Sequence, residues 1–238
     1  MKLDILAFAS HPDDIELSCS GTIISHIKQG YKVGIVDLTR GELGTRGTPE
    51  IRLKESEAAS KVMGIHAREN LGFKDGFFVN DKEHQLEIVK MIRKYQPEIV
   101  FANAISDRHP DHGKGADVVR DAIFISGLRM VATELDGELQ EPWRPKVVYH
   151  YIQNNYINPD VIVDISEHWE GKLASIKAFK SQFFDPNSKE PQSFISSPEF
   201  MNFLEARAKE FGHAINSKYG EGFTVARKIG VKNLFDLT

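Results

Sequence analysis

Two short segments of this chain place histidine and aspartate side chains around a proline. The first is residues 11–14 (HPDD) and the second is residues 109–112 (HPDH). Imidazole and carboxylate groups are the usual ligands of a catalytic zinc ion, which takes three protein ligands and keeps one position for water. Either segment alone is weak evidence, because Asp in the first turn of a helix also stabilises the helix end. The two segments together predict metal-assisted hydrolysis.

The spacing within each segment indicates which side chains could bind the metal and which could have a catalytic role. Residues three apart at a turn into a helix can point at one atom, which pairs His11 with Asp14. The same spacing pairs His109 with His112, and one of these four must have another role if the zinc has three protein ligands. Asp13 is placed to act as general base on water. An imidazole that is not a ligand could stabilise the oxyanion formed when water attacks a carbonyl. The same set of metal donors would also accept ferrous iron.

The elements that must position these residues follow an alternating pattern. Apolar runs alternate with helical patterns, which is typical of a parallel sheet with crossover helices. We expect strands at residues 3–9, 31–38, 67–71, 98–102, 146–153 and 161–165, helices at residues 14–29, 49–63, 81–95, 111–126, 167–183 and 198–216, and loops at residues 39–48 and 184–197. Both segments follow expected strands, so they should meet at the carboxyl edge of one sheet. The predicted fold class is α/β, with a doubly wound, mostly parallel sheet in a single domain over residues 1–238 and a C-terminal elaboration.

Composition narrows the class of protein. The chain has 238 residues, of which 41% are hydrophobic and 27% charged, enough apolar material for a sizeable core. The net charge of −4 argues against a nucleic-acid partner, and no segment reaches the ~20 apolar residues of a membrane span. The single cysteine, Cys19, excludes an internal disulfide and fits a reducing compartment. We therefore expect a cytoplasmic protein with no membrane partner.

The chain resembles the LmbE-like/PIG-L zinc N-deacetylases, which hydrolyse N-acetylglucosamine-containing substrates. The resemblance covers nearly the whole chain. It rests on the two segments above, on residues 21–22 (GT), on residues 39–45 (TRGELGT), and on Arg52 and Glu55. Residues 107–112 (DRHPDH) and 181–183 (SQF) look most like the branch of bacillithiol biosynthesis deacetylases, which remove acetyl from N-acetylglucosaminyl malate.

The resemblance implies specific roles for the residues of the two segments. It implies a Rossmann-like sheet and a zinc ion held by His11, Asp14 and His112. It implies Asp13 as general base and His109 as transition-state stabiliser. The general acid stays open between these last two residues. Homohexamers are common in the closest branch, so the resemblance also implies a homo-oligomer.

Charged residues outside the metal ligands are candidates for substrate binding. Arg40 and Arg52 lie in and after a glycine-rich loop, and an arginine offers paired donors to a carboxylate or phosphate. The resemblance implies a site near Arg52 for a sugar phosphate or a carboxylated aglycone. Asp107 and Arg108 precede the second segment, where they could pair with each other or contact the substrate. A solvated loop with ion pairs would also explain the loop arginines.

These observations predict a zinc-dependent hydrolase that removes the N-acetyl group from an amino-sugar substrate, with N-acetylglucosaminyl malate as the first candidate. Two alternatives stay open. One is a deacetylase of another amino sugar or an amidase of a thiol S-conjugate, which a panel of aglycones would distinguish. The other is a non-catalytic sugar-binding or metal-binding module, against which Asp13 argues, because a binding site has no use for an unliganded carboxylate beside the metal.

Overall fold

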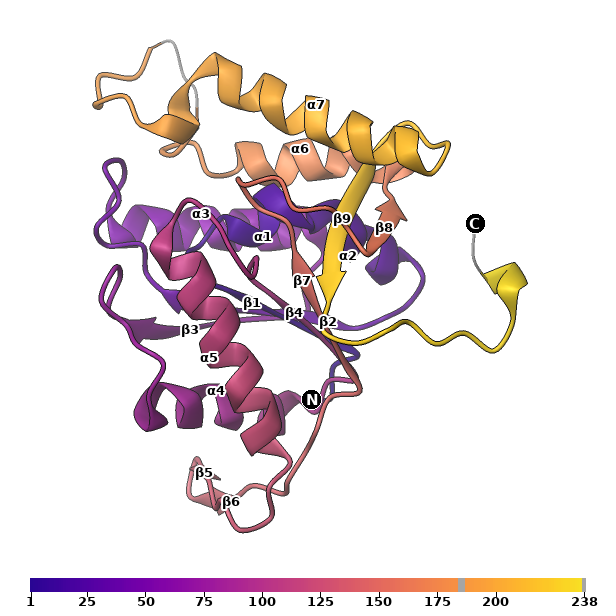
Figure 1. Cartoon of the computed structure of the whole chain (residues 1–238). Helices are drawn as coiled ribbons and strands as arrows, with labels where there is room; N and C mark the ends of the chain where they lie inside the picture. The colour runs from indigo at the N-terminus through magenta and orange to yellow at the C-terminus, as the bar shows by residue number, and fades with distance from the viewer. Residues whose placement is uncertain (184–186, 237–238) are drawn as a thin grey trace.

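A seven-stranded sheet runs through the computed structural model, which describes residues 1–183 and 187–236 (Figure 1). From one edge to the other, its strands are β3 (Ala67–Phe73), β2 (Val33–Thr39), β1 (Ile5–Ala9), β4 (Ile99–Ala102), β7 (Val147–Tyr151), β9 (Gly220–Val225) and β8 (Val161–Asp164). The pairs from β3 to β7 are parallel, whereas β9 runs antiparallel to both neighbours. The predicted mostly parallel α/β sheet is confirmed.

Helices cover both faces of this sheet. They are α1 (Asp14–Ser18), α2 (Ser20–Lys28), α3 (Pro49–Met63), α4 (Lys82–Tyr95), α5 (Pro110–Ser126), α6 (Trp169–Lys177) and α7 (Pro198–Ala214), with short 3₁₀ turns η1 (Ser166–His168), η2 (Phe194–Ser196) and η3 (Leu234–Asp236). A small hairpin, β5 (Glu134–Leu135) with β6 (Glu138–Leu139), lies apart from the main sheet. Helices α4 and α5 pack on one face, and the other helices lie on the opposite side (Figure 1).

The central strand β1 shows why the sequence forms this three-layer arrangement. Ile5, Ala7 and Ala9 enter the hydrophobic core beneath α2, α3 and α6. Leu6 and Phe8 enter the core beneath α4 and α5. Successive side chains of a strand point to opposite faces, so a strand covered on both faces must be apolar at every position. All five residues of β1 are buried, as its uninterrupted apolar run predicts.

The order of the strands creates a crevice at the centre of the sheet. The chain passes from β1 to β2 on one side of β1, whereas β4 lies on its other side. The connections beyond the carboxyl ends of β1 and β4 therefore diverge, and in open α/β sheets this is where ligands bind. The HPDD segment begins two residues after β1, and Asn103 follows β4 directly. The predicted meeting of the two segments at one sheet edge is confirmed.

The helix expected over residues 14–29 is in fact two helices. Cys19 separates α1 from α2, with φ −140° and ψ 17°. The break exposes the first amides of α2, and Glu221 of β9 accepts hydrogen bonds from Gly21 N (3.0 Å) and Thr22 N (2.7 Å). The first N–H groups of a helix have no partners within the helix. A carboxylate from the far end of the chain therefore decides where α2 begins.

Three further expectations differ from the structure. Strand β9 was not predicted, because its sequence (GEGFTV) contains two glycines, and β5 and β6 were not predicted either. Gly222 allows α7 to pack closely, since a Cβ there would lie 2.9 Å from the Phe211 ring. The helix expected over residues 167–183 ends at Lys177. The expected loop at residues 184–197 contains η2, and residues 184–186 lie outside the described residues.

The structure bears on two features noted in the sequence, the lack of a membrane-spanning segment and the single cysteine. Within residues 1–183 and 187–236, no helix is long and apolar enough to cross a membrane. Cys19 is fully buried, and burial raises the pKa of its thiol well above the ordinary value. The thiol is therefore a packing group in the core beneath α2.

A buried ion pair joins α6 to β9 in the C-terminal part of the chain, and both partners also bond the N-terminal helices, Lys172 to Leu17 O and Glu221 to Gly21 N and Thr22 N. Lys172 Nζ of α6 lies 2.7 Å from Glu221 Oε1, and both side chains are almost fully buried. We expect Lys172→Met to lower the free energy of unfolding by about 3–5 kcal/mol, because it leaves the carboxylate buried without its partner. Urea unfolding followed by circular dichroism measures this effect.

The control for this prediction is the exposed pair of Lys146 with Glu98, where Lys146→Met should change the unfolding midpoint little. The double variant Lys172→Met/Glu221→Gln should be less destabilised than Lys172→Met alone. Equal midpoints for Lys172→Met and Lys146→Met would show that the buried pair does not fasten these elements.

Candidate active site

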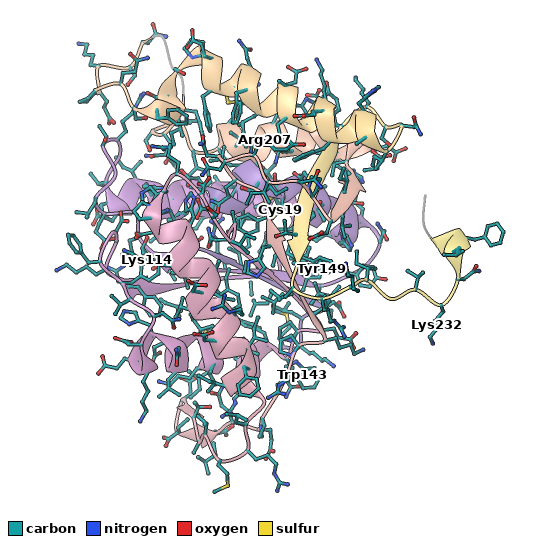
Figure 2. All side chains as sticks on the ribbon, viewed as in Figure 1. Cys19, Lys114, Trp143, Tyr149, Arg207 and Lys232 are labelled. Atoms are coloured by element: carbon teal, nitrogen blue, oxygen red, sulfur yellow. The ribbon has the colours of Figure 1, made fainter. Side chains whose placement is uncertain are left out.

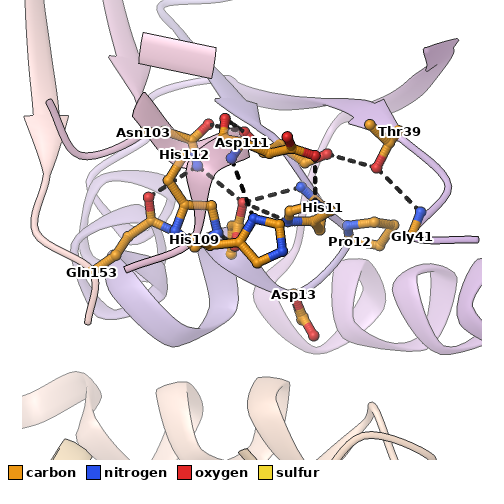
Figure 3. Close-up of polar contacts among 12 residues, drawn as sticks. His11, Pro12, Asp13, Thr39, Gly41, Asn103, His109, Asp111, His112 and Gln153 are labelled. Carbon is orange, nitrogen blue, oxygen red and sulfur yellow. Dashed lines mark hydrogen bonds and ion pairs between the residues drawn. The ribbon is translucent and has the colours of Figure 1, made fainter. Parts of the chain in front are cut away.

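The two predicted segments meet beyond the carboxyl ends of β1 and β4, and their imidazoles form a compact group (Figure 3). The ring centroids of His11 and His109 are 4.6 Å apart, and those of His109 and His112 are 5.1 Å apart. One nitrogen from each of the three rings lies within 4.8 Å of the others. This grouping could hold a metal ion, and the carboxylate of Asp14 adjoins it.

Asp14 is the carboxylate that contacts two of these imidazoles. Its Oδ1 lies 3.1 Å from His112 Nε2, and its Oδ2 lies 3.8 Å from His11 Nδ1. Asn103 Nδ2 (2.9 Å) and Gln153 Nε2 (3.1 Å) donate hydrogen bonds to the same carboxylate. Burial acts to raise the pKa of Asp14, but the charge and hydrogen bond of His112 and the charge and backbone N–H of His11 lower it below its ordinary range. Asp14 is therefore an ionised carboxylate, the form in which a metal ligand must be.

The donor atoms of His11, Asp14 and His112 could hold a divalent metal ion. Donors around a tetrahedral zinc lie roughly 3.3 Å apart, because each is about 2.0–2.2 Å from the ion. The contact of Asp14 Oδ1 with His112 Nε2 (3.1 Å) and that of Asp14 Oδ2 with His11 Nδ1 (3.8 Å) are close to this separation. Two imidazole nitrogens and one carboxylate oxygen are also a donor set that catalytic zinc uses.

Each of these two histidines has a carboxylate on the nitrogen that faces away from Asp14. His11 Nε2 donates to Asp75 Oδ1 (3.0 Å) and lies 3.5 Å from Asp111 Oδ2. His112 Nδ1 donates to Asp107 Oδ2 (2.6 Å). Metal-binding histidines usually have such a partner, which fixes the tautomer and the orientation of the ring.

These carboxylates also determine the charge of the two histidines. Burial acts to lower the pKa of His11, but Asp111 and Asp75 raise it to about 10. Burial likewise acts to lower the pKa of His112, but Asp14 and Asp107 raise it to about 9. Because a metal ligand must give up its proton, binding of a metal here must release protons.

We call His11, Asp14 and His112 the metal-ligand group. Asp13 is buried beside it but takes no part in the contacts drawn in Figure 3. Its backbone has φ 119°, a left-handed conformation that non-glycine residues rarely adopt and that concentrates at functional sites. Arg52 Nη2 donates to Asp13 Oδ2 (3.1 Å). Burial raises the pKa of Asp13 to about 7, although the charge of Arg52 opposes this. A carboxylate with such a pKa can take up and return a proton near neutral pH.

His109 lies at the N-terminus of α5, where its Nδ1 accepts a hydrogen bond from Asp111 N (3.3 Å). Burial lowers the pKa of His109, and the charges of His11 and His112 lower it further. The ring is therefore neutral, and because Nδ1 is the acceptor, the proton is on Nε2. A protonated Nε2 can donate a hydrogen bond but cannot bind a metal.

The predicted substrate-binding residues near the second segment have different surroundings. The Asp107 carboxylate is buried and accepts hydrogen bonds from His112 and from Asn155 N (2.6 Å). Its contacts thus orient His112, and no ion pair joins it to Arg108 among the described residues. The guanidinium of Arg108 instead stacks on Phe194 in the cavity wall. Contact of Arg108 with a substrate stays a prediction.

The other two predicted substrate-binding residues, Arg40 in the loop after β2 and Arg52 on α3, have different surroundings from each other. Arg52 is in the cavity wall, where its Nη1 donates to Gly41 O and its Nη2 donates to Pro12 O and Asp13 Oδ2. It therefore positions Asp13, and contact with a substrate stays a prediction. Arg40 is exposed beside Gly72 and is not among the described residues that line the cavity, so the fold does not bring it to the site. The loop turns away after β2.

Several residues of the site were not singled out from the sequence. Asp75 follows β3 by two residues, Asn103 follows β4 directly, and Gln153 follows β7 by two residues. Each polar side chain therefore lies just beyond the carboxyl end of a parallel strand, which is a signal the sequence carried. Arg207 of α7 also lines the cavity, but nothing in the sequence pattern placed it there.

The cavity in front of these residues has a volume of about 560 Å³. The HPDD and HPDH segments form its floor, and η2 and α7 form part of its wall. This volume suits a small-molecule ligand, because such sites are commonly about 300–1,000 Å³. His and Asp donors grouped at the carboxyl edge of a mostly parallel α/β sheet are the arrangement that a metal-dependent hydrolase needs.

Comparison with known proteins places the chain within this class. Residues 6–123 match the family model described as PIG-L: GlcNAc-PI de-N-acetylase. A probable N-acetyl-alpha-D-glucosaminyl L-malate deacetylase 2 from Bacillus cereus is 30% identical over 76% of this chain and 84% of its own length. The diacetylchitobiose deacetylase of Thermococcus kodakarensis is 29% identical over 92% of this chain and 81% of its own.

A solved structure shows the same fold over nearly the whole chain. The conserved protein TT1542 from Thermus thermophilus is 34% identical, covers 98% of both chains and superposes with a TM-score of 0.87. The chain therefore belongs to the PIG-L/LmbE-like deacetylase family, and it is an enzyme of the N-deacetylase class. The predicted resemblance and the predicted enzyme class are confirmed.

Proposed function

We propose that this protein is a zinc-dependent hydrolase that removes the acetyl group from an N-acetylglucosamine conjugate, with N-acetylglucosaminyl malate in bacillithiol biosynthesis as the substrate. One observation carries the proposal. A buried carboxylate, Asp13, lies beside a metal-ligand group without belonging to it, and its pKa is raised to about 7. Such an arrangement has no purpose in a protein that only binds a sugar.

His11, Asp14 and His112 would hold the metal ion. When bound, zinc would polarise the acyl carbonyl and lower the pKa of a water toward ~7. Asp75 and Asp107 orient the two imidazoles for this role. Ferrous iron is compatible with the same donors.

The side chains of this chain then move the protons. Asp13 takes one proton from the attacking water as its oxygen adds to the amide carbon. His109 Nε2–H donates a hydrogen bond to the oxyanion that develops on the carbonyl oxygen. Asp13 returns its proton to the amide nitrogen as the C–N bond breaks, which yields acetate and the free amine. Arg52 holds the Asp13 carboxylate in place throughout.

The proposed substrate follows from the relatives and from the charge of the cavity. One relative is named a probable N-acetylglucosaminyl malate deacetylase and the other a diacetylchitobiose deacetylase. Both names describe N-acetylglucosamine joined to another group, and only malate carries carboxylates. Arg108 in the cavity wall favours the acidic conjugate. Another amino sugar or a thiol S-conjugate would use the same site.

We further propose that the protein is cytoplasmic and that it forms a homo-oligomer such as a hexamer.

Acetate release tests this proposal. We expect the purified protein to release acetate from N-acetylglucosaminyl malate, to lose this activity after chelation and dialysis, and to regain it with one zinc ion per chain. The same assay with N,N′-diacetylchitobiose and a thiol S-conjugate ranks the alternatives. If zinc-loaded protein releases acetate or a free amine from none of these compounds, the proposal is wrong and the binding-module interpretation takes its place.

A further inference from the structure

Two arginines in the cavity wall have no acidic partner among the described residues. Arg46 and Arg52, which also line the cavity, have carboxylates at 3.7 Å (Glu190) and 3.1 Å (Asp13). Across the part of the chain that the structure describes, no carboxylate oxygen lies within 4.0 Å of the guanidinium groups of Arg108 or Arg207. Arg108 is exposed, whereas Arg207 is half-buried. A partly buried cation such as Arg207 is costly without a paired anion unless a ligand supplies the negative charge.

Both guanidinium groups are held in place by aromatic rings. Arg108 Cζ lies 4.3 Å from the centroid of Phe194, and Arg207 Cζ lies 4.4 Å from the centroid of Phe203. Phe200 joins these rings, with centroids 5.6 Å from Phe194 and 6.2 Å from Phe203. Stacking of this kind fixes a guanidinium plane while its N–H edge stays free.

Arg207 is the better fixed of the two. Its Nη2 donates to Asn154 O (2.7 Å), so helix α7 is connected to the loop after β7. Figure 2 labels Arg207 on the side of α7 that faces the rest of the molecule. Burial lowers the pKa of Arg207 to about 10, although the charge of Asp107 opposes this. The Asp107 carboxylate is already bonded to His112 and Asn155, which leaves the remaining Arg207 donors for a ligand.

Two rings of the row formed by Phe194, Phe200 and Phe203 are also open to solvent at the cavity. Phe194 is 53% exposed and Phe203 is 39% exposed. Exposed aromatic rings that line a cavity next to fixed cations are typical of a ligand-binding surface.

We propose that Arg207 and Arg108, mounted on the row of Phe194, Phe200 and Phe203, form an anion subsite that binds a carboxylate or phosphate on the aglycone of the substrate. The inference rests on the proposed function and deepens it, since it assigns the aglycone to α7 and the acetyl group to the metal-ligand group. Arg207 is then a specificity-determining residue that does not act on the amide bond.

The test compares acidic and neutral substrates in zinc-loaded enzyme. The substrates are N-acetylglucosaminyl malate, N-acetylglucosamine 1-phosphate and the neutral methyl N-acetylglucosaminide. We expect Arg207→Met to raise KM for an acidic substrate about 10- to 100-fold with kcat nearly unchanged, because a charge-assisted hydrogen bond is lost. KM for the neutral substrate should change less than about two-fold, and Arg207→Lys should restore part of the loss. The acidic substrate that loses more identifies carboxylate or phosphate as the preferred group.

The matched control is Arg120→Met on the exposed face of α5, which should change neither KM. Equal KM increases for acidic and neutral substrates in Arg207→Met would overturn the subsite while the proposed function stands. If the wild type hydrolyses no N-acetyl sugar, the proposed function fails, and calorimetry with L-malate decides the subsite. Binding by the wild type that Arg207→Met loses supports the subsite, and equal binding or no binding overturns it.

Discussion

Asp13→Asn is expected to lose about 10²- to 10⁴-fold in kcat while it keeps one zinc ion per chain. General acid–base catalysis by one positioned group is worth about this much. Asparagine has the size of aspartate and can accept the hydrogen bond from Arg52 Nη2, but it cannot take up a proton. Steady-state acetate release, with zinc measured on the same sample, checks both parts of this prediction.

The control for Asp13→Asn is Asp117→Asn on the exposed face of α5, which should keep full activity. Loss of zinc from the Asp13→Asn protein would show that Asp13 is a ligand and that the division of roles between Asp13 and Asp14 is wrong. Full activity with zinc retained would remove Asp13 from the mechanism.

The second large effect is expected at the metal ligands. Asp14→Ala should leave the protein without bound zinc after dialysis and without measurable turnover. The variant removes an ionised, buried donor that contacts both His112 and His11. His109→Ala should keep its zinc and lose about 10²- to 10³-fold in kcat, as removal of one oxyanion donor does. Zinc content and a zinc titration of each apo-protein measure the difference.

This pair of variants distinguishes two possible ligand groups. The three imidazoles of His11, His109 and His112 are close enough together to bind a metal without Asp14. If His109→Ala loses zinc and Asp14→Ala keeps it, the three imidazoles are the ligands and Asp14 is an outer partner. The tautomer of His109 predicts the opposite result, because its Nε2 carries the proton.

The sequence by itself was sufficient for the fold class and for the floor of the site. Continuous apolar runs such as β1 are forced into a sheet that is covered on both faces, so strand positions could be predicted from local composition. The HPDD and HPDH segments follow strands, and in a parallel sheet the carboxyl ends of strands share one edge. The meeting of His11 with His112 therefore followed from topology and required no knowledge of individual contacts.

The outer partners of the site were decided only by tertiary structure. Asp75 lies 64 positions after His11 in the chain, and it contacts His11 because β3 and β1 end at the same edge of the sheet. Asp107 was predicted to contact the substrate or Arg108, yet its carboxylate binds His112. Arg40 was grouped with Arg52 because both follow β2, but Arg40 is exposed in the loop, whereas Arg52 on α3 contacts Asp13. A local pattern gives residue types, whereas side-chain direction depends on packing against distant segments.

The C-terminal third shows most clearly which features depend on tertiary structure and cannot be predicted from the local sequence. Glu221 lies in a glycine-containing strand that no periodicity predicted, and it caps the start of a helix 199 positions earlier at Thr22. Arg207 is one of many charged residues on an amphipathic helix, and only the docking of α7 places it in the cavity. The sequence determined which chemistry the chain can perform, because ligand and base types are fixed locally in two motifs. The tertiary structure decided which charges surround that chemistry, because those charges come from segments that only the packed sheet brings together.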